Sequence, residues 1–241
     1  MMAKKGASKH VKRLAISKVV PLTNKKQHVW IIRTAPGPHS NKKSIPLVVV
    51  LRDVLKFAKT SDEAKKIIYG RQVHIDGIVR TNPAFPVGFM DVLHFPKAGI
   101  SYQLLYDRKG RLIPKEIDKH KTDKKLLKVV DKHTIKGGKT SLTLHDGRSI
   151  IADNKIHVGD SVLISIPEVK IQSVLKLEQG VTCFITEGKH AGVIAKLKEI
   201  IQRKEGKQTE AKLENKEEGE FITVAKYLFV INHDFASIPS K

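Results

Sequence analysis

The chain has 241 residues, 40% of them hydrophobic, which is enough to build two or three small domains with buried cores. Its 45 basic and 24 acidic residues give a net charge of +21, so a polyanion is the expected partner. No apolar run approaches the roughly 20 residues that a membrane-spanning helix needs. The lysine-rich start does not have the pattern of a secretory signal. We therefore expect no membrane contact.

The single cysteine, Cys183, excludes an internal disulfide and every zinc motif that is built from cysteine pairs. It lies in an apolar strand pattern with Val181, Phe184 and Ile185, which predicts a small buried thiol and not a nucleophile. None of the eleven histidines forms an H-x-x-x-H pair beside an acid. We expect no metal and no cofactor.

Positive charge is concentrated at the start of the chain. Residues 1–46 hold eleven Lys and Arg and no acid, whereas residues 204–241 hold six basic and seven acidic residues. Such a segment repels itself in isolation, but phosphates make the same charges favourable through counterion release. We predict an extended basic arm over residues 1–46 that binds RNA through Lys4, Lys5, Lys9, His10, Lys12, Arg13, Lys18, Lys25, Lys26, Arg33, His39, Lys42 and Lys43.

The alternative for this segment is a solvated, disordered tail. Scattered apolar residues and turn residues among the charges favour nucleic-acid binding over that alternative. Trp30, the only tryptophan, could stack on a base or dock on the next domain, and we favour docking.

Residues 47–96 predict two short helices, a hairpin and a final strand. Apolar residues at helical spacing predict a first helix with one buried face, made by Leu47, Leu51, Val54, Leu55 and Ala58. Thr60 and Glu63 predict a capping box for a second helix, which ends at Gly70 and buries Ala64, Ile67 and Ile68. The pair Asp76-Gly77 predicts a tight hairpin turn, and residues 90–95 predict a strand after a turn at residues 86–88.

This order of elements, followed by a P-x-G-x-x-D-V segment, resembles the S4-type RNA-binding domain. In that family the two helices and the hairpin form a basic surface that grips folded RNA. The resemblance implies RNA contacts at the matching basic positions, Arg52, Lys56, Lys59, Lys65, Lys66, Arg71 and Arg80. A solvated helix face is an equal alternative for any single lysine, but the cluster as a whole favours RNA.

Residues 97–176 predict a central antiparallel β-domain, because short strand patterns alternate with turns. Residues 119–125 predict a charged loop, and residues 140–145 and 148–152 predict a second hairpin with its turn at Asp146-Gly147. Lys136, Lys139 and Arg148 lie at predicted hairpin tips, where they could touch phosphates, although exposed turn lysines need no function.

The last part of the chain, residues 177–241, contains a segment that resembles the KOW motif at Gly188, Lys189, Gly192, Val193 and Ile194. That motif marks small five-stranded barrels in ribosomal proteins and transcription elongation factors. The resemblance implies a KOW β-barrel domain with an RNA contact at Lys189. Residues 204–220, rich in Glu, Lys and Gln, predict a solvated loop.

Taken together, the chain is similar to the small-subunit ribosomal protein S4e family of archaea and eukaryotes. The similarity is carried by residues 10–15, 37–39, 79–81, 86–92 and 106–111. It implies an α+β multidomain protein without a catalytic site or small-molecule substrate. It also implies a cytoplasmic location in the small ribosomal subunit, with rRNA and neighbouring ribosomal proteins as partners. The short, acid-balanced C-terminus indicates an archaeal source.

Two other protein classes share parts of this pattern. Pseudouridine synthases carry an S4-type domain and a G-R-L-D catalytic motif, but here Gly110-Arg111-Leu112 is followed by Ile113, which cannot act as a carboxylate. A KOW-bearing transcription factor would explain the last domain, but neither the acid-free start nor the helical module.

Overall fold

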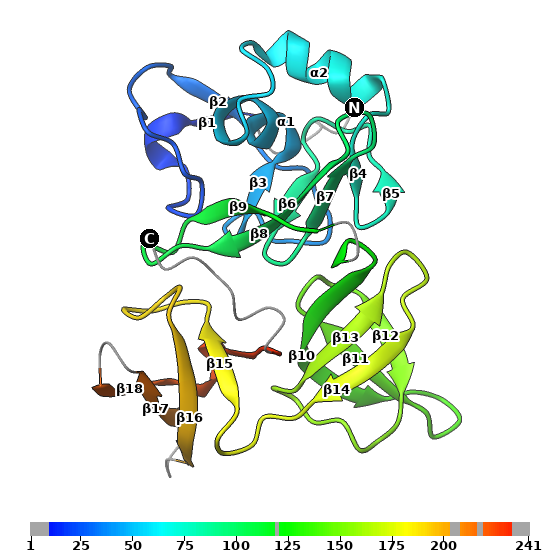
Figure 1. The fold of residues 1–241 in the computed structure, drawn as a ribbon, viewed down its shortest axis with the longest axis vertical. Helices are drawn as coiled ribbons and strands as arrows, with labels where there is room; N and C mark the ends of the chain where they lie inside the picture. Colours follow the sequence, from blue (N-terminus) through cyan, green and yellow to red (C-terminus); the bar gives the residue numbers. More distant parts are fainter. Residues whose placement is uncertain (1–9, 119–120, 203–207, 216–218, 233–241) are drawn as a thin grey trace, which may run out of the picture. The chain divides into compact units, whose positions relative to one another are not determined.

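A computed structural model of the chain describes residues 10–118, 121–202, 208–215 and 219–232. The fold is mostly β with few helices (Figure 1). It divides into two compact units, the first made of Met1–Leu104 with Arg111–Ile117 and the second of Leu105–Gly110 with Asp118–Lys241. Within the described residues, no helix is long and apolar enough to cross a membrane.

The first unit is built on a five-stranded sheet in the order β5-β4-β7-β8-β9. Its strands are β4 (His74–Ile75), β5 (Ile78–Val79), β7 (Val92–Phe95), β8 (Ile100–Tyr106) and β9 (Leu112–Glu116). The predicted Asp76-Gly77 turn is confirmed, since both residues have positive φ angles of 50° and 73°. Strands β8 and β9 complete this sheet, so the first unit extends beyond the predicted boundary at residue 96.

Residues 10–46 fold onto this unit, so the predicted extended arm is wrong for these residues. Strand β1 (His10–Lys12) leads into a 3-10 turn and pairs with β2 (Trp30–Ile32), while β3 (Ser44–Pro46) pairs with β6 (Pro86–Gly88). Two of the scattered apolar residues enter a core, since Val20 and Ile31 are 3% and 4% exposed. The amide of Leu112 also donates to the carbonyl of Val19 at 2.8 Å. Lys4, Lys5 and Lys9 lie outside the described residues.

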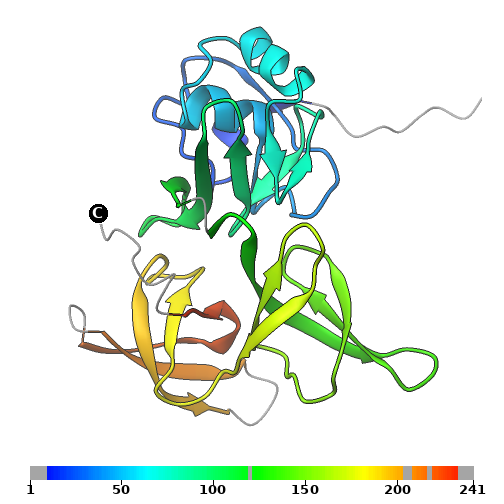
Figure 2. The ribbon, with the colours of Figure 1, turned by 45° about the vertical axis from the view of Figure 1, so that its right-hand side comes forward.

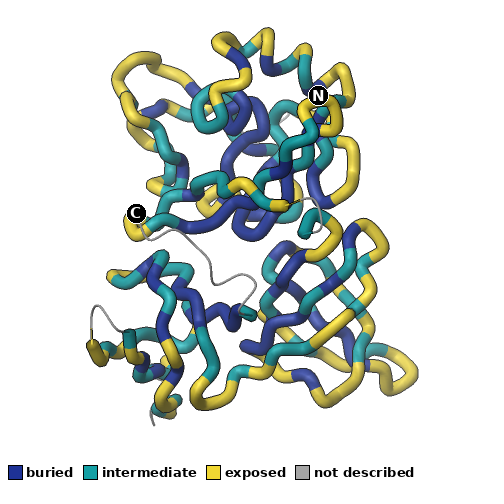
Figure 3. Tube along the Cα trace, viewed as in Figure 1, coloured by how far each residue is buried: buried dark blue, intermediate teal, exposed yellow. Residues whose placement is uncertain are grey.

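The first helix is shorter than predicted. Helix α1 (Leu47–Val49) continues into a π-helical turn over Val50–Val54, and Lys56 then takes a positive φ of 58°. The run Leu47–Leu51 is buried on all sides, so it has no polar face (dark blue in Figure 3). The positions Lys56 and Lys59 therefore lie in the connection to the next helix and not on a helix face.

Helix α2 (Ser61–Tyr69) begins as predicted with a complete capping box. Thr60 Oγ1 accepts a hydrogen bond from the Glu63 amide at 3.2 Å, and Glu63 Oε2 accepts one from the Thr60 amide at 3.4 Å. Ala64 and Ile68 are buried as predicted, whereas Ile67 is half-buried. Gly70 ends the helix with a φ of −68°, and the left-handed position falls on Arg71 instead, with a φ of 55°.

The second unit contains two five-stranded antiparallel sheets, in the orders β12-β11-β10-β13-β14 and β18-β17-β16-β15-β19 (Figure 2). The first consists of β10 (Lys124–Thr134), β11 (Thr140–Leu144), β12 (Ser149–Ala152), β13 (Ser161–Ser165) and β14 (Ile171–Leu175). The second consists of β15 (Thr182–Ile185), β16 (Ile194–Ile201), β17 (Glu210–Asn215), β18 (Gly219–Val224) and β19 (Leu228–Val230).

These strands confirm the predicted hairpin at Asp146-Gly147, where β11 pairs with β12. They correct the predicted loop over residues 204–220, because Glu210–Asn215 forms β17. Ala211 and Leu213 are fully buried on one face of that strand, while charged neighbours alternate with them. Ala211 and Leu213 are two positions apart, which is the spacing of a half-buried strand. The many charged residues around them made this pattern hard to recognise in the sequence.

A lysine from β10 joins the two sheets of the second unit. Lys128 Nζ donates to the carbonyl oxygens of Lys226 and Leu228 at 2.7 and 2.6 Å, and the rings of His145 and Phe229 meet edge to face at 5.7 Å. Backbone carbonyls thus bind this ammonium group inside the unit.

The cysteine is buried as predicted, since Cys183 is 0% exposed in β15. Burial raises the pKa of the Cys183 thiol to about 12, against a smaller opposite effect from Lys128, so the thiol stays protonated at neutral pH. We predict that iodoacetamide at pH 8 leaves the native protein unmodified and alkylates Cys183 fully in denaturant. Mass spectrometry gives the count, and alkylation of the native protein at the rate of an exposed thiol would contradict a buried, protonated group.

Candidate nucleic-acid interface

The folded N-terminal segment presents a cationic surface. Eight Lys and Arg side chains and no acid occur in residues 10–46. Of the basic residues predicted to touch RNA here, some are exposed, namely His10, Lys12, Lys18, Lys26, Lys42 and Lys43, and two are half-buried, namely Lys25 and Arg33. The local field is therefore positive, since no carboxylate of this segment offsets it.

Two predicted contact residues of this segment are used inside the protein. Arg13 is 4% exposed and its Nη2 donates to the carbonyl of Asn24 at 3.1 Å, which holds the loop between β1 and β2. His39 is 7% exposed, and its Nε2 lies 2.9 Å from Asp91 Oδ1. Asp91 Oδ2 also accepts a hydrogen bond from the Gly88 amide at 2.8 Å. Burial removes Arg13 and His39 from the accessible surface.

The seven positions implied by the S4-type resemblance divide in the same way. Lys56, Lys59, Lys66 and Arg71 are exposed. Lys65 is half-buried, and its Nζ lies 3.0 Å from Asp62 Oδ1, a solvent-exposed pair of the kind that contributes little to stability.

Arg52 and Arg80 are held by their own unit. Arg52 donates to both carboxylate oxygens of Asp53, at 3.1 and 2.7 Å, and its Nη1 donates to Ser61 Oγ at 2.5 Å. It thereby fixes the π-helical turn to the start of α2. The guanidinium carbon of Arg80 lies 4.5 Å from the centre of the Phe85 ring, a cation–π arrangement that orients the half-buried side chain.

In the second unit, the turn between β15 and β16 exposes Lys189 next to Gly188, which has a positive φ of 96°. Gly192 in the same turn has a φ of 79° and approaches the backbone of Asp107 and Arg108 so closely that an added Cβ would lie 2.6 Å from it. A fixed turn therefore presents the lysine.

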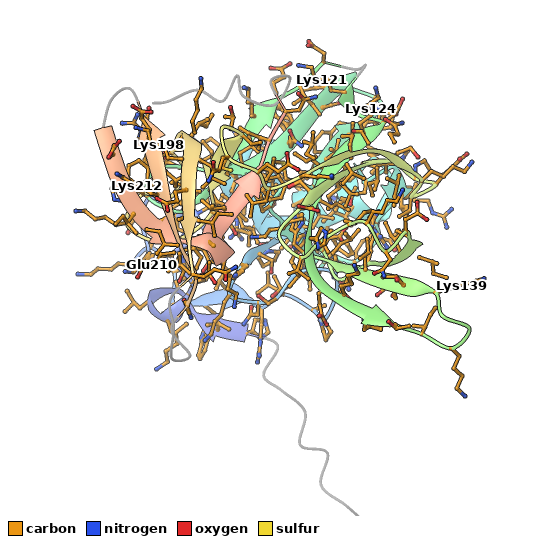
Figure 4. All side chains as sticks on the ribbon, turned by 90° about the horizontal axis from the view of Figure 1, so that it is seen from below. Lys121, Lys124, Lys139, Lys198, Glu210 and Lys212 are labelled. Carbon is orange, nitrogen blue, oxygen red and sulfur yellow. The ribbon has the colours of Figure 1, made fainter. Side chains whose placement is uncertain are left out.

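On β16 to β18, lysines and glutamates of the same sheet pair with one another. Lys198 Nζ lies 3.3 Å from Glu214 and 2.5 Å from Glu220, and Lys212 Nζ lies 2.6 Å from Glu220 (Lys198 and Lys212 are labelled in Figure 4). Hydrogen bonds from Lys198 and Lys212 lower the pKa of Glu220 to about 2, so it stays ionised with them. These lysines meet carboxylates of their own sheet, which makes this face a poor phosphate site.

The basic residues at the two predicted hairpin tips differ in their exposure. Arg148 Nε lies 3.1 Å from the buried carboxylate of Asp146, which the fully buried Lys125 also approaches at 3.7 Å. Lys139 is exposed at the tip of the β10–β11 hairpin (Figure 4). Lys136 is exposed in the same turn, so these two lysines are placed to reach a ligand. Within the described residues, no group of three His, Cys, Asp or Glu could hold a metal ion.

Three family descriptions match consecutive parts of the chain. The RS4NT (NUC023) domain matches residues 5–42, the S4 domain residues 45–93, and Ribosomal family S4e residues 98–171. A small ribosomal subunit protein eS4 from Methanosphaera stadtmanae is 46% identical over 233 residues, covering 97% of this chain and 96% of the relative. The chain belongs to the ribosomal S4e family.

Other members of the S4e family are also similar to this chain over most of its length. The eS4 protein of Methanothermobacter thermautotrophicus is 40% identical, with 97% of this chain and 96% of the relative covered. The crystal structure of the 30S ribosomal protein S4e from Thermoplasma acidophilum is 34% identical, with a TM-score of 0.69, and covers 79% of this chain and 95% of that one. The predicted S4e family and its S4 domain are confirmed, while the KOW assignment stays a prediction.

Proposed function

We propose that this S4e-family chain is a structural constituent of the small ribosomal subunit that binds rRNA in translation, and that it is not an enzyme. The observation that carries the proposal is the near full-length identity of 46% to a protein named as a small ribosomal subunit protein. The net charge of +21 and the S4 domain at residues 45–93 support it independently. Neighbouring ribosomal proteins are the other expected partners, and the cytoplasm, where ribosomes translate, is the expected location.

Two cationic groups of the first unit supply the proposed RNA contacts. The first is the segment around β1 and β2, and the second is the connection and helix that carry Lys56, Lys59, Lys66 and Arg71. Lys65 joins the second group by exchanging Asp62 for a phosphate. Arg52 and Arg80 act by positioning, since their guanidinium groups contact Asp53, Ser61 and Phe85. The basic residues Lys4, Lys5 and Lys9 add charge from outside the described residues.

For the turn between β15 and β16 we propose a KOW-type contact. The positive φ angles of Gly188 and Gly192 and the exposure of Lys189 support this proposal. A small exposed turn of this kind approaches a phosphate or a protein backbone closely, because its glycines add no side-chain bulk.

Salt dependence tests the proposed electrostatic binding. We expect the logarithm of the affinity for small-subunit rRNA to fall linearly with the logarithm of salt concentration, by about 0.7–0.9 per phosphate neutralised. Lys26→Gln and Lys66→Gln should each reduce that slope by about one such step. Filter binding at several salt concentrations measures it.

Lys198→Gln is the matched control, because it removes the same charge from the balanced face of β16 to β18 and should leave the slope unchanged. An affinity for rRNA that does not change from low to moderate salt would defeat the proposed function.

A further inference from the structure

The outer face of the β1–β2 pair carries the only tryptophan of the chain. In this register Val11 lies opposite Ile31 and Lys12 opposite Trp30. Side chains alternate between the two faces of a strand, and Ile31 is 4% exposed while Trp30 is 57% exposed. Ile31 therefore points into the core of the first unit and Trp30 points to solvent. The predicted docking of Trp30 on the next domain, residues 47–96, is thus wrong.

An indole in this position needs an explanation, because a large apolar group gains stability from burial and most tryptophans are largely buried. The exposure is not confined to one side chain. All residues from Lys26 to Trp30 are exposed (yellow in Figure 3), and Leu14 and Val29 are 68% and 65% exposed beside the strand ends. The pair presents an apolar surface that the first unit does not use for its own core.

The charges around this surface indicate what covers it. Lys12 stands directly opposite Trp30, where cross-strand Cβ atoms are about 5 Å apart, and His10 follows two residues away on the same face. Lys26 and His28 are exposed in the turn that leads into β2, and residues 10–46 contain no acid. A polyanion can pair with the cations of this surface. An apolar protein face would instead remove water from Lys12 without giving it a partner.

A nucleobase next to its own phosphate matches both features. Bases stack on exposed aromatic side chains with little dependence on sequence, and cations beside the ring bind the adjacent phosphate. In a duplex both faces of each base are covered by neighbours, so the base must be unpaired. We propose that Trp30 stacks on an unpaired nucleobase of the RNA while Lys12 contacts the flanking phosphate. This inference rests on the proposed function and assigns one contact within it.

Fluorescence gives a direct test, because Trp30 is the sole tryptophan and its emission reports on this side chain alone. The full-length protein is titrated with a small-subunit rRNA transcript and, separately, with a fully paired RNA duplex. Stacking predicts that the transcript quenches the emission with the same midpoint that filter binding gives. The duplex is expected to bind without the same quenching.

Variants separate stacking from simple apolar contact. Trp30→Phe, which keeps an aromatic face, should bind the transcript within a few-fold of the wild type, whereas Trp30→Leu and Trp30→Ala should weaken binding by roughly 10- to 100-fold. The salt slope should be unchanged in all three, because no charge is removed, while Lys12→Gln should lower it by about 0.7–0.9. Ile222→Ala, which removes a side chain of similar exposure (53%) from the charge-balanced face of β18, should have no effect.

The two levels of the proposal fail differently. If the wild-type protein does not bind the transcript at low salt, the proposed function itself is wrong. If it binds but the emission stays unchanged, or if Trp30→Leu binds as well as Trp30→Phe, only the stacking contact is wrong. Loss of incorporation into the small subunit by Trp30→Ala with unchanged RNA affinity would instead assign the surface to a protein partner. Circular dichroism of each variant checks that the fold is intact.

Discussion

Removal of residues 1–46 should unfold the first unit and not only weaken RNA binding. The deletion takes away three buried aliphatic side chains, Val20, Ile31 and Ile45, which are 3%, 4% and 0% exposed. Each such loss costs roughly 2–4 kcal/mol, so together they approach the 5–15 kcal/mol of stability that a typical domain has. The deletion also removes β3, leaving β6 without its partner, and leaves Asp91 without His39.

Hydrogen–deuterium exchange resolved by peptide measures this outcome. In the truncated protein the amides of α2 and β7 should exchange as in an unfolded chain, while those of β10 and β16 in the second unit keep their protection. Removal of residues 1–9 is the matched control, since every contact described above remains and protection should persist throughout. Full protection of α2 after the longer deletion would show that residues 10–46 are a dispensable appendage. Because the long deletion destroys the unit, RNA contacts of this segment must be measured with point variants.

This outcome also marks where the sequence was misleading. Eleven basic residues without an acid suggested an extended arm, because like charges repel. The charges lie mostly on the surface, however, and Val20, Ile31 and Ile45 between them are buried. The segment also hydrogen-bonds to β9 through Val19 and pairs with β6 through β3. Such long-range contacts leave no periodic signal within the segment itself. The strand β17 was missed for a related reason, since only Ala211 and Leu213 interrupt its polar sequence.

Local signals were read correctly where local chemistry decides the structure. The Thr60–Glu63 capping box and the Asp76-Gly77 turn depend on residues three or fewer positions apart, and both are present. The length and the polar face of the first helix were predicted wrongly. The run Leu47–Leu51 is buried on all sides, so helical spacing could not identify one buried face or the end of the helix. For the candidate interface, charge identified which segments are basic. Burial alone distinguished exposed lysines from Arg13 and His39, whose partners Asn24 and Asp91 lie 11 and 52 positions away along the chain.

Substitution of Gly192 by alanine should destabilise the second unit by about 3 kcal/mol or more. Gly192 has a φ of +79°, a conformation that costs a non-glycine residue roughly 1–2 kcal/mol. Its added Cβ would also lie 2.6 Å from the Arg108 nitrogen and the Asp107 carbonyl carbon, which are backbone atoms and cannot rotate away. The turn must therefore move off residues 107–108 or strain β15, because the Gly192 amide donates to the carbonyl of Ile185 at 2.8 Å. Urea denaturation monitored by circular dichroism measures the loss.

Two other glycines separate the strain from the clash. Gly180→Ala places a methyl group at a φ of +85° with nothing within 4 Å, so it should cost only the backbone term of roughly 1–2 kcal/mol. Gly188→Ala, with a φ of +96° and its nearest neighbour, Tyr227, at an ordinary 3.6 Å, should fall close to the same value. The excess of Gly192→Ala over these two is then the cost of the clash between the added Cβ and the Asp107–Arg108 backbone. Equal losses at all three glycines would mean that this contact yields without cost, and that the turn presenting Lys189 is not fixed by it.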